Sequence, residues 1–201
     1  MKPPVPRLHA VTDDAVLALP DFEGRALDIA RAGDVAVHLR ASRTPAGRLT
    51  DLAARLAGQH VTVLVNDRAD VALAAGASGV HAPAHGLPTE ILRRLLPPSR
   101  LVGRSVHDVH EAHRAARDGA DYVFLGPVWE TPTHRGREGL GTAPLRTAAP
   151  ATVIAIGGLT PERARACGRA GAYGVAAIRA LWYADDPASA AEEMLVSLGQ
   201  G

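Results

Sequence analysis

Two separated stretches of this sequence carry residues suited to binding a phosphate group. Residues 126–136 follow an apolar run and read Gly-Pro-Val-Trp-Glu-Thr-Pro-Thr-His-Arg-Gly, while a later apolar run ends at Gly157-Gly158 before Leu-Thr-Pro. Glycine leaves backbone N–H donors uncovered, and a helix that begins just beyond adds the positive end of its dipole. We therefore expect a monophosphate dianion on Gly157 and Gly158, with the hydroxyls of Thr131 and Thr133 beside it. Arg179 either clamps the same phosphate or points to solvent.

Polar side chains also recur where other apolar runs end. They are His38 with Arg40, Asn66 with Asp67, His81 alone, and Ser105 with His107. If these runs are parallel strands of one barrel, their carboxyl ends meet at a single mouth and the polar groups form a ring. We expect His38, Arg40, Asn66, Asp67 and Ser105 of this ring to bind the substrate. Imidazole titrates near neutral pH, so His134, His107 and His81 are our candidates, in that order, for carrying a proton.

The elements that must position these groups alternate along the whole chain. Short runs rich in Val, Ile and Leu are separated by longer segments of helical character. The expected strands are 7–12, 35–40, 61–65, 79–81, 101–105, 121–125, 152–156 and 174–178. The expected helices are 24–32, 44–57, 67–75, 88–96, 108–118, 142–149, 160–170 and 186–198.

Three of the helix-to-strand connections repeat one small-residue phrase. Ala75-Gly76-Ala77, Asp118-Gly119-Ala120 and Ala170-Gly171-Ala172 each end a helix at glycine just before an apolar run. Strands joined in this way are parallel, and eight of them close into a barrel. We predict an α/β fold, a single (β/α)8 TIM barrel over residues 1–201. The alternative is an open doubly wound sheet, but no Gly-x-Gly-x-x-Gly follows the first expected strand.

The amino-acid composition limits the kinds of molecule that the protein can bind. The chain has 201 residues, 47% of them apolar, and its 22 basic and 21 acidic residues leave a net charge of +1. That balance predicts no binding to nucleic acid or to a membrane surface. The prolines near the N-terminus argue against a signal peptide, and the single Cys167 predicts a packed thiol, so we expect a cytoplasmic protein. Trp182 and Tyr183 suggest either a homodimer contact or ordinary packing of a helix on the barrel.

Six separated motifs resemble one known family. They are Val-His-Leu-Arg at 37–40, Val-Asn-Asp-Arg-Ala-Asp at 65–70, Gly-Val-His at 79–81, Gly-Arg-Ser-Val-His at 103–107, Gly-Ala-Asp-Tyr-Val with Gly-Pro-Val at 119–128, and Ala-Ile-Gly-Gly at 155–158. In this order and spacing the chain resembles the thiamine phosphate synthase and thiazole tautomerase family over nearly its whole length. The resemblance implies a barrel that binds a small thiazole phosphate in thiamine biosynthesis.

One activity of that family is synthesis, which joins a pyrimidine diphosphate to the thiazole phosphate and uses Mg²⁺. Arg40, Asn66, Asp67 and Ser105 match the synthase pattern, with Asp67 as the implied magnesium ligand. However, Ser42 and His134 stand where the family has lysines, and Gly86 stands where it has a second aspartate. Losing these charges removes contacts that are typically worth about 1.5–3 kcal/mol each. The departures argue against efficient synthesis.

The other activity is a tautomerisation, which moves a proton within a thiazole carboxylate phosphate and needs no metal or other cofactor. The family's tautomerase histidine falls at Pro127 here, so another histidine must serve. Our leading hypothesis is a thiazole tautomerase, with thiamine phosphate synthase as the alternative. A third alternative is a barrel that binds the phosphate ligand without catalysis. Schiff-base chemistry is excluded at the strand ends because Lys2 is the only lysine.

Overall fold

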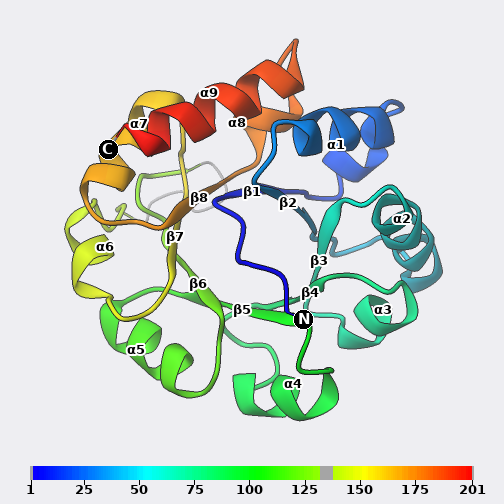
Figure 1. Cartoon of the computed structure of the whole chain (residues 1–201), viewed down its shortest axis with the longest axis horizontal. Coiled ribbons are helices and arrows are strands. Elements are labelled where there is room, and N and C mark those ends of the chain that lie inside the picture. The colour runs from blue at the N-terminus through cyan, green and yellow to red at the C-terminus, as the bar shows by residue number, and fades with distance from the viewer. Residues whose placement is uncertain (1, 132–137, 201) are drawn as a thin grey trace.

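Eight parallel strands, paired in chain order and closed by a pairing of the first strand with the last, form the centre of the structure (Figure 1). The computed structural model describes residues 2–131 and 138–200. The strands are β1 (Leu8–Val11), β2 (Val35–Leu39), β3 (Thr62–Asn66), β4 (Gly79–Ala82), β5 (Leu101–Val106), β6 (Tyr122–Leu125), β7 (Val153–Ile156) and β8 (Gly174–Ala177). Each lies within two residues of its expected bounds. The predicted TIM barrel is confirmed, and the open sheet is excluded.

Helices cover the outside of this barrel (Figure 1). They are α1 (Phe22–Arg31), α2 (Ala46–Gly58), α3 (Ala69–Ala74), α4 (Thr89–Leu95), α5 (Val109–Arg117), α6 (Ala143–Thr147), α7 (Pro161–Arg169), α8 (Arg179–Trp182) and α9 (Pro187–Gly199), with a short 3-10 helix η1 at Val16–Ala18. Side chains cap α5, α7 and α9, where Asp108, Thr160 and Asp186 each accept a hydrogen bond from a backbone N–H in the first turn. The two short elements η1 and α8 were not predicted.

Apolar side chains form two cores, one on each face of the cylindrical sheet. The larger lies between strands and helices and includes Val37, Val63 and Leu125. The smaller fills the barrel interior and includes Leu64, Tyr122 and Phe124. Alternate residues of each strand face the two cores because side chains on a strand point to opposite faces in turn. The interior core therefore closes the barrel beneath any site at its mouth.

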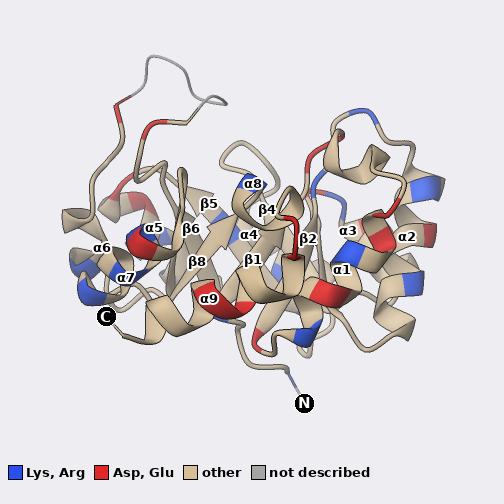
Figure 2. Ribbon diagram, turned by 90° about the horizontal axis from the view of Figure 1, so that it is seen from above, with Lys and Arg blue, Asp and Glu red and all other residues tan. Residues whose placement is uncertain are grey.

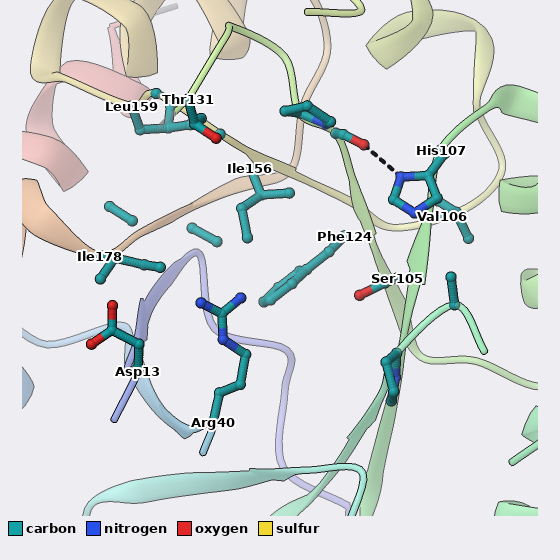
Figure 3. A pocket seen from close by; sticks show the side chains of 18 of the residues that line it. Asp13, Arg40, Ser105, Val106, His107, Phe124, Thr131, Ile156, Leu159 and Ile178 are labelled. Atoms are coloured by element: carbon teal, nitrogen blue, oxygen red, sulfur yellow. Dashed lines mark hydrogen bonds between the residues drawn. The ribbon is translucent and has the colours of Figure 1, made fainter. Parts of the chain in front are cut away.

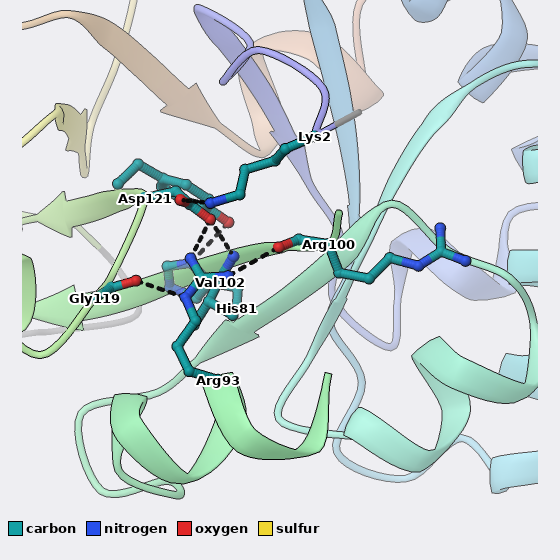
Figure 4. Close-up of polar contacts among 8 residues, drawn as sticks. Lys2, His81, Arg93, Arg100, Val102, Gly119 and Asp121 are labelled. Atoms are coloured by element: carbon teal, nitrogen blue, oxygen red, sulfur yellow. Dashed lines mark hydrogen bonds and ion pairs between the residues drawn. The ribbon is translucent and has the colours of Figure 1, made fainter. Parts of the chain in front are cut away.

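The N-terminal segment crosses the end of the barrel opposite the mouth (Figure 1). The Lys2 ammonium lies 2.6 Å from Asp121 Oδ1, and Asp121 also pairs with the Arg93 guanidinium (Figure 4). Arg93 donates further hydrogen bonds to the carbonyl oxygens of Gly119 and Arg100, at 2.7 and 2.9 Å. We call Lys2, Arg93 and Asp121 the floor cluster. It ties the segment to the start of β6.

Elsewhere, acidic and basic residues are interleaved along the outer helices (Figure 2). No helix in the described part of the chain is long and apolar enough to cross a membrane.

Trp182 and Tyr183, the suggested contact for a second copy, have different surroundings. The Trp182 indole is fully buried, stacks on Phe22 at 5.3 Å between ring centroids, and donates a hydrogen bond from Nε1 to the Val11 carbonyl. Tyr183 is 51% exposed. Trp182 thus packs α8 on the barrel, and only Tyr183 is accessible to a partner.

Candidate active site

A cavity of about 390 Å³ opens at the carboxyl ends of the strands. Its lining includes seven residues that the sequence predicts for the site (Figure 3): Arg40, Ser105, His107, Thr131, Gly157, Gly158 and Arg179. They come from β5, from the loops after β2, β5, β6 and β7, and from the start of α8, which follows β8. The strand order of the barrel therefore brings together groups that lie far apart in the sequence, as the mouth of a TIM barrel requires.

Arg40 supplies a cation on one side of this cavity (Figure 3). The buried Thr12 fixes its backbone, since Thr12 Oγ1 accepts from the Arg40 N–H and donates to the Arg40 carbonyl, both at 2.9 Å. Burial lowers the pKa of the guanidinium, and the nearby Asp13 and Asp14 partly oppose that shift. Among the described residues the guanidinium has no hydrogen-bond or ion-pair partner. A desolvated cation without a partner is suited to an anionic ligand.

Gly157 and Gly158 also line the cavity, as do Thr131 and Leu159. Their φ angles of 104° and 68° are in the left-handed region, which glycine adopts readily. A Cβ on Gly157 would lie 2.7 Å from the Pro127 Cβ, so the loop after β6 packs directly on this backbone. The turn then leads to the capping Thr160 at the start of α7. Glycines that end a strand just before a helix N-terminus are the kind of backbone that can bind an anion.

Ser105 is held from below by a buried histidine. His81 Nε2 lies 2.8 Å from Ser105 Oγ, and His81 Nδ1 lies 3.2 Å from the Tyr122 hydroxyl. Burial lowers the pKa of His81 well below its ordinary value, with smaller contributions from His9, Arg104 and Arg40. His81 is therefore a neutral residue beneath the cavity, reaching it only through Ser105.

His38 also lies beneath the cavity rather than in its lining. It is 1% exposed, and its Nε2 is 2.6 Å from Nδ1 of the fully buried His9. Burial lowers the pKa of His9 to about 3 and that of His38 well below its ordinary value. We expected His38 to bind substrate. In the structure it contacts His9 in the barrel interior and does not line the cavity.

His107 is the one of our three proton-carrier candidates that the structure places in the cavity lining. Its Nδ1 lies 2.8 Å from the Gly126 carbonyl, which can only accept, so Nδ1 carries the hydrogen (Figure 3). Its backbone N–H donates to the Glu111 carboxylate at 2.7 Å. These two contacts orient the ring and leave Nε2 for a ligand. His134 and Thr133 lie outside the described residues.

Asn66 and Asp67, predicted to bind substrate, follow β3 but do not line the cavity. Asp67 is exposed and has a φ of 64°. A Cβ on Gly86 would lie 2.8 Å from Asp67 Oδ1, so a side chain at position 86 would reach this carboxylate. Positions 67 and 86 are therefore neighbours in space. Because position 86 is glycine, Asp67 is the only carboxylate of these two positions.

Two residues that follow β1 belong to the site and were not predicted, and neither was His85, which also lines the cavity. Asp13 lines the cavity beside Arg40 (Figure 3), and Thr12 holds the Arg40 backbone as described above. Both follow β1, where the sequence analysis assigned no polar group to the mouth. The Thr12-Asp13 pair, at the end of the first expected strand (residues 7–12), was the signal that could have indicated them.

Comparison with known proteins decides the family. The chain matches the sequence pattern described as "Thiamine monophosphate synthase" over residues 8–181. The chain belongs to this family. The resemblance noted from the six motifs is thereby confirmed, and with it the assignment to a family of enzymes of thiamine biosynthesis.

Individual relatives are thiamine-phosphate synthases. The chain is 40% identical over 178 residues to that of Anaeromyxobacter dehalogenans, covering 84% of this chain and 79% of the relative. It is 43% identical over 141 residues to that of Thermosynechococcus vestitus, covering 69% of this chain but only 40% of the relative's length. Among solved structures, a thiamine phosphate pyrophosphorylase from Pyrococcus furiosus superposes with a TM-score of 0.82, at 27% identity and 96% coverage of both chains. These matches favour the synthase, the alternative in the sequence analysis, over the tautomerase.

Proposed function

We propose that this chain is a thiamine-phosphate synthase, which joins a hydroxymethylpyrimidine diphosphate to a thiazole phosphate. The observation that carries the proposal is the pair of anion-binding features in one cavity. Arg40 is a partly buried cation without a hydrogen-bond or ion-pair partner among the described residues, and Gly157-Gly158 offer a second, separate place where an anion could bind the backbone. Two anion sites suit a reaction of two phosphorylated substrates.

In this reaction the thiazole nitrogen attacks the methylene carbon of the pyrimidine, and the bond from that carbon to the diphosphate oxygen breaks. Positive charge develops on the methylene carbon while negative charge collects on the departing diphosphate. Arg40 and Ser105 would bind that diphosphate, and preorganised donors at such a position stabilise the charge that develops. Gly157, Gly158 and Arg179 would bind the thiazole phosphate and so aim its nitrogen at the carbon.

The donor set fits magnesium only as a partner of the diphosphate. Within the described ranges, no three His, Cys, Asp or Glu side chains gather into a site for a metal ion. Mg²⁺ is commonly held by one or two carboxylates together with substrate phosphate oxygens. Asp67 would be the carboxylate here, since its neighbour Gly86 has no side chain. When bound, the ion would supply neutralisation of the leaving group.

The departures at positions 42 and 86 predict a slow synthase rather than an inactive one. Ser42 donates its backbone N–H to Asp14 at 2.9 Å, so the loop after β2 is held in place although it lacks the lysine that the family resemblance implies. Asp14 accepts further hydrogen bonds from the backbone of Arg43 and Thr44, which lower its pKa. The loop that carries position 42 is therefore ordered without the cation.

Incubation of the purified protein with both substrates and Mg²⁺ tests the proposal. We expect thiamine phosphate to form, together with one diphosphate per turnover, and Arg40→Ala to slow the formation of both by about 10²–10³. Ser42→Lys and Gly86→Asp, which restore charges, should each raise the rate. Turnover no faster than in a mixture lacking protein would refute the synthase assignment.

Thiazole tautomerisation remains a second candidate because of His107. Its Nδ1 is fixed on the Gly126 carbonyl and its Nε2 is available at the cavity, as a proton carrier requires. Incubation with the thiazole carboxylate phosphate alone separates the two reactions. Isomerisation that is lost in His107→Gln, without synthesis from the two-substrate mixture, would favour the tautomerase.

A further inference from the structure

A row of hydrogen bonds connects the closed interior of the barrel to the cavity. It runs from the Tyr122 hydroxyl to His81 Nδ1 at 3.2 Å, and from His81 Nε2 to Ser105 Oγ at 2.8 Å. Tyr122 and His81 are only 1% and 2% exposed, whereas Ser105 lines the cavity. Bulk solvent therefore does not reach the first two groups, and the contacts they make with each other and with Ser105 indicate where each hydrogen lies.

The direction of this row follows from the Tyr122 hydroxyl. Among the described residues its only hydrogen-bond partner is His81. A buried O–H that fails to donate is costly, whereas an oxygen lone pair left without a donor is tolerated better. Burial also raises the pKa of Tyr122 well above its ordinary value, so the hydroxyl keeps its hydrogen. Tyr122 thus donates to His81 Nδ1.

The tautomer of His81 is then settled. The imidazole is neutral, so it carries one hydrogen on its two nitrogens. Because Nδ1 accepts from Tyr122, that hydrogen lies on Nε2 and is donated to Ser105 Oγ. We infer that Tyr122 and His81 are positioning residues that leave the Ser105 hydroxyl hydrogen free to donate into the cavity, toward a phosphate or diphosphate oxygen. The identity of that anion rests on the proposed function.

The chain makes room for this arrangement at Gly103, two residues before Ser105 on β5. A Cβ on Gly103 would lie 2.1 Å from Cζ and 2.3 Å from the hydroxyl oxygen of Tyr122. Any side chain there would displace the Tyr122 ring and with it the contact to His81. The absence of a side chain at 103 thus permits the hydrogen-bonded row.

The other buried histidine pair shows the contrast. His9 Nε2 lies 2.8 Å from the Pro6 carbonyl, which can only accept, so the His9 hydrogen is on Nε2 and its Nδ1 accepts from His38. That pair donates toward the backbone of the N-terminal segment and away from the cavity. Of the two rows, only the one through His81 ends on a cavity-lining hydroxyl, which is why we assign it a role in binding.

The histidine tautomer can be measured without any substrate. Two-bond ¹H–¹⁵N correlation spectra of the imidazole groups distinguish an Nε2–H from an Nδ1–H ring, and the His81 signals are identified by their loss in His81→Gln. We expect the Nε2–H tautomer in the unmodified protein and a shift toward Nδ1–H in Tyr122→Phe. An Nδ1–H tautomer in the unmodified protein would overturn the inference.

Binding of inorganic pyrophosphate, measured by calorimetry, tests the consequence. We expect Tyr122→Phe to weaken binding about twofold to tenfold, the ordinary worth of one hydrogen bond, and to have no further effect when Ser105 is already alanine. Tyr183→Phe, on an exposed tyrosine outside the cavity, should leave affinity unchanged. Equal weakening by Tyr122→Phe with and without Ser105 would show a general packing effect and refute the role of the row.

The two proposals fail in different ways. If the unmodified protein binds no pyrophosphate and forms no thiamine phosphate, the proposed function is refuted, while the tautomer of His81 still decides the direction of the row. If it binds pyrophosphate but His81 has the Nδ1–H form, only the positioning inference is refuted.

Discussion

The two ends of the barrel use charged side chains in opposite ways. In the floor cluster, each charge faces a partner: Lys2 and Arg93 share the Asp121 carboxylate, and Arg93 also donates to two backbone carbonyls (Figure 4). At the mouth, the partly buried Arg40 guanidinium has no such partner in the described part of the chain (Figure 3). Paired charges fix the chain at one end, and an unpaired one is available for a ligand at the other.

Between the two ends, the buried histidines resemble the floor cluster, because each of them is hydrogen-bonded to another residue. His9 and His38 hydrogen-bond to each other, and His81 bonds to Tyr122 and Ser105. Burial keeps all three neutral by lowering their pKa values. The contrast teaches that burial alone does not mark a functional cation, because the barrel buries polar groups for both purposes. What distinguishes Arg40 is a partly buried guanidinium, in the wall of a cavity, that has no hydrogen-bond or ion-pair partner among the described residues.

The largest expected effect is a loss of stability at acidic pH, caused by the buried histidines of the barrel interior. Below pH 6.5 the unfolded chain protonates His9, His38 and His81, while the folded chain keeps them neutral down to far lower pH, about 3 for His9. The three histidines therefore contribute their full share of the free energy of unfolding above pH 6.5, and this free energy falls as the pH decreases. The expected loss is about 1.4 kcal/mol per pH unit for each histidine, or about 4 kcal/mol per pH unit for all three. Urea unfolding at pH 7, 6 and 5 measures this.

The window between pH 6.5 and 5 isolates the histidines. Carboxylates whose pKa is lowered, such as Asp14 and Asp70, lose their contribution only at more acidic pH. His110→Gln, on the exposed surface of α5, should leave the pH dependence unchanged. A free energy of unfolding that stays constant across this window would mean that the interior accepts protons when folded.

Arg40→Ala should produce the next largest effect, and on activity rather than on stability. Loss of a donor that stabilises developing charge typically lowers kcat by about 10²–10³, and we expect that range for the synthase reaction. Because the guanidinium has no partner to leave behind, the free energy of unfolding should change by less than about 1 kcal/mol. Steady-state kinetics and urea unfolding of one preparation test both halves. A loss of stability as large as the loss of transition-state stabilisation would show that Arg40 supports the fold, as the charges of the floor cluster do.

Arg93→Ala should have the reverse profile. It removes the partner of Asp121 and the donor to two carbonyls, so we expect about 2–3 kcal/mol of destabilisation with kcat unchanged at a temperature where the variant is folded. Arg94→Ala is the matched control, because Arg94 is the next residue of α4 and is exposed. A reduced kcat in folded Arg93→Ala would show that the two ends are coupled.

Much of the fold could be predicted from the sequence, because each parallel strand is an apolar run and each helix joins its strand at a recognisable turn. The joins at Gly76, Gly119 and Gly171, for example, have the positive φ angles that the repeated phrase indicates. The short helices η1 and α8 were missed. Each spans at most four residues, too few for a helical period to be detected.

The site could be predicted in part, for a related reason. Position along the chain places a residue at a strand end, but it does not report depth in the barrel. His38 and Arg40 are two residues apart, yet one lies in the closed interior and the other in the cavity lining. The hydrogen bonds of His81 and the contribution of Asp13 arise between strands, which the order of residues does not show.

Gly157→Ala offers the finest test of the mouth, through a comparison of two glycines. Gly157 and Gly33 have φ angles of 104° and 113°, so alanine strains the backbone at either position, by about 1–3 kcal/mol. A Cβ meets nothing within 4 Å at Gly33, but at Gly157 it lies 2.7 Å from Pro127. Both variants should therefore lose stability, with Gly157→Ala losing more.

Only Gly157→Ala should also raise the KM for the thiazole phosphate, because the added methyl displaces the loop after β6 from the proposed anion site. We expect an increase of about tenfold, corresponding to about 1.4 kcal/mol, and no change in Gly33→Ala. Thermal unfolding and substrate titrations of the two variants, side by side, separate backbone strain from the loss of a binding surface. An equal KM in both would place the phosphate away from Gly157 and leave the turn after β7 with a purely structural role.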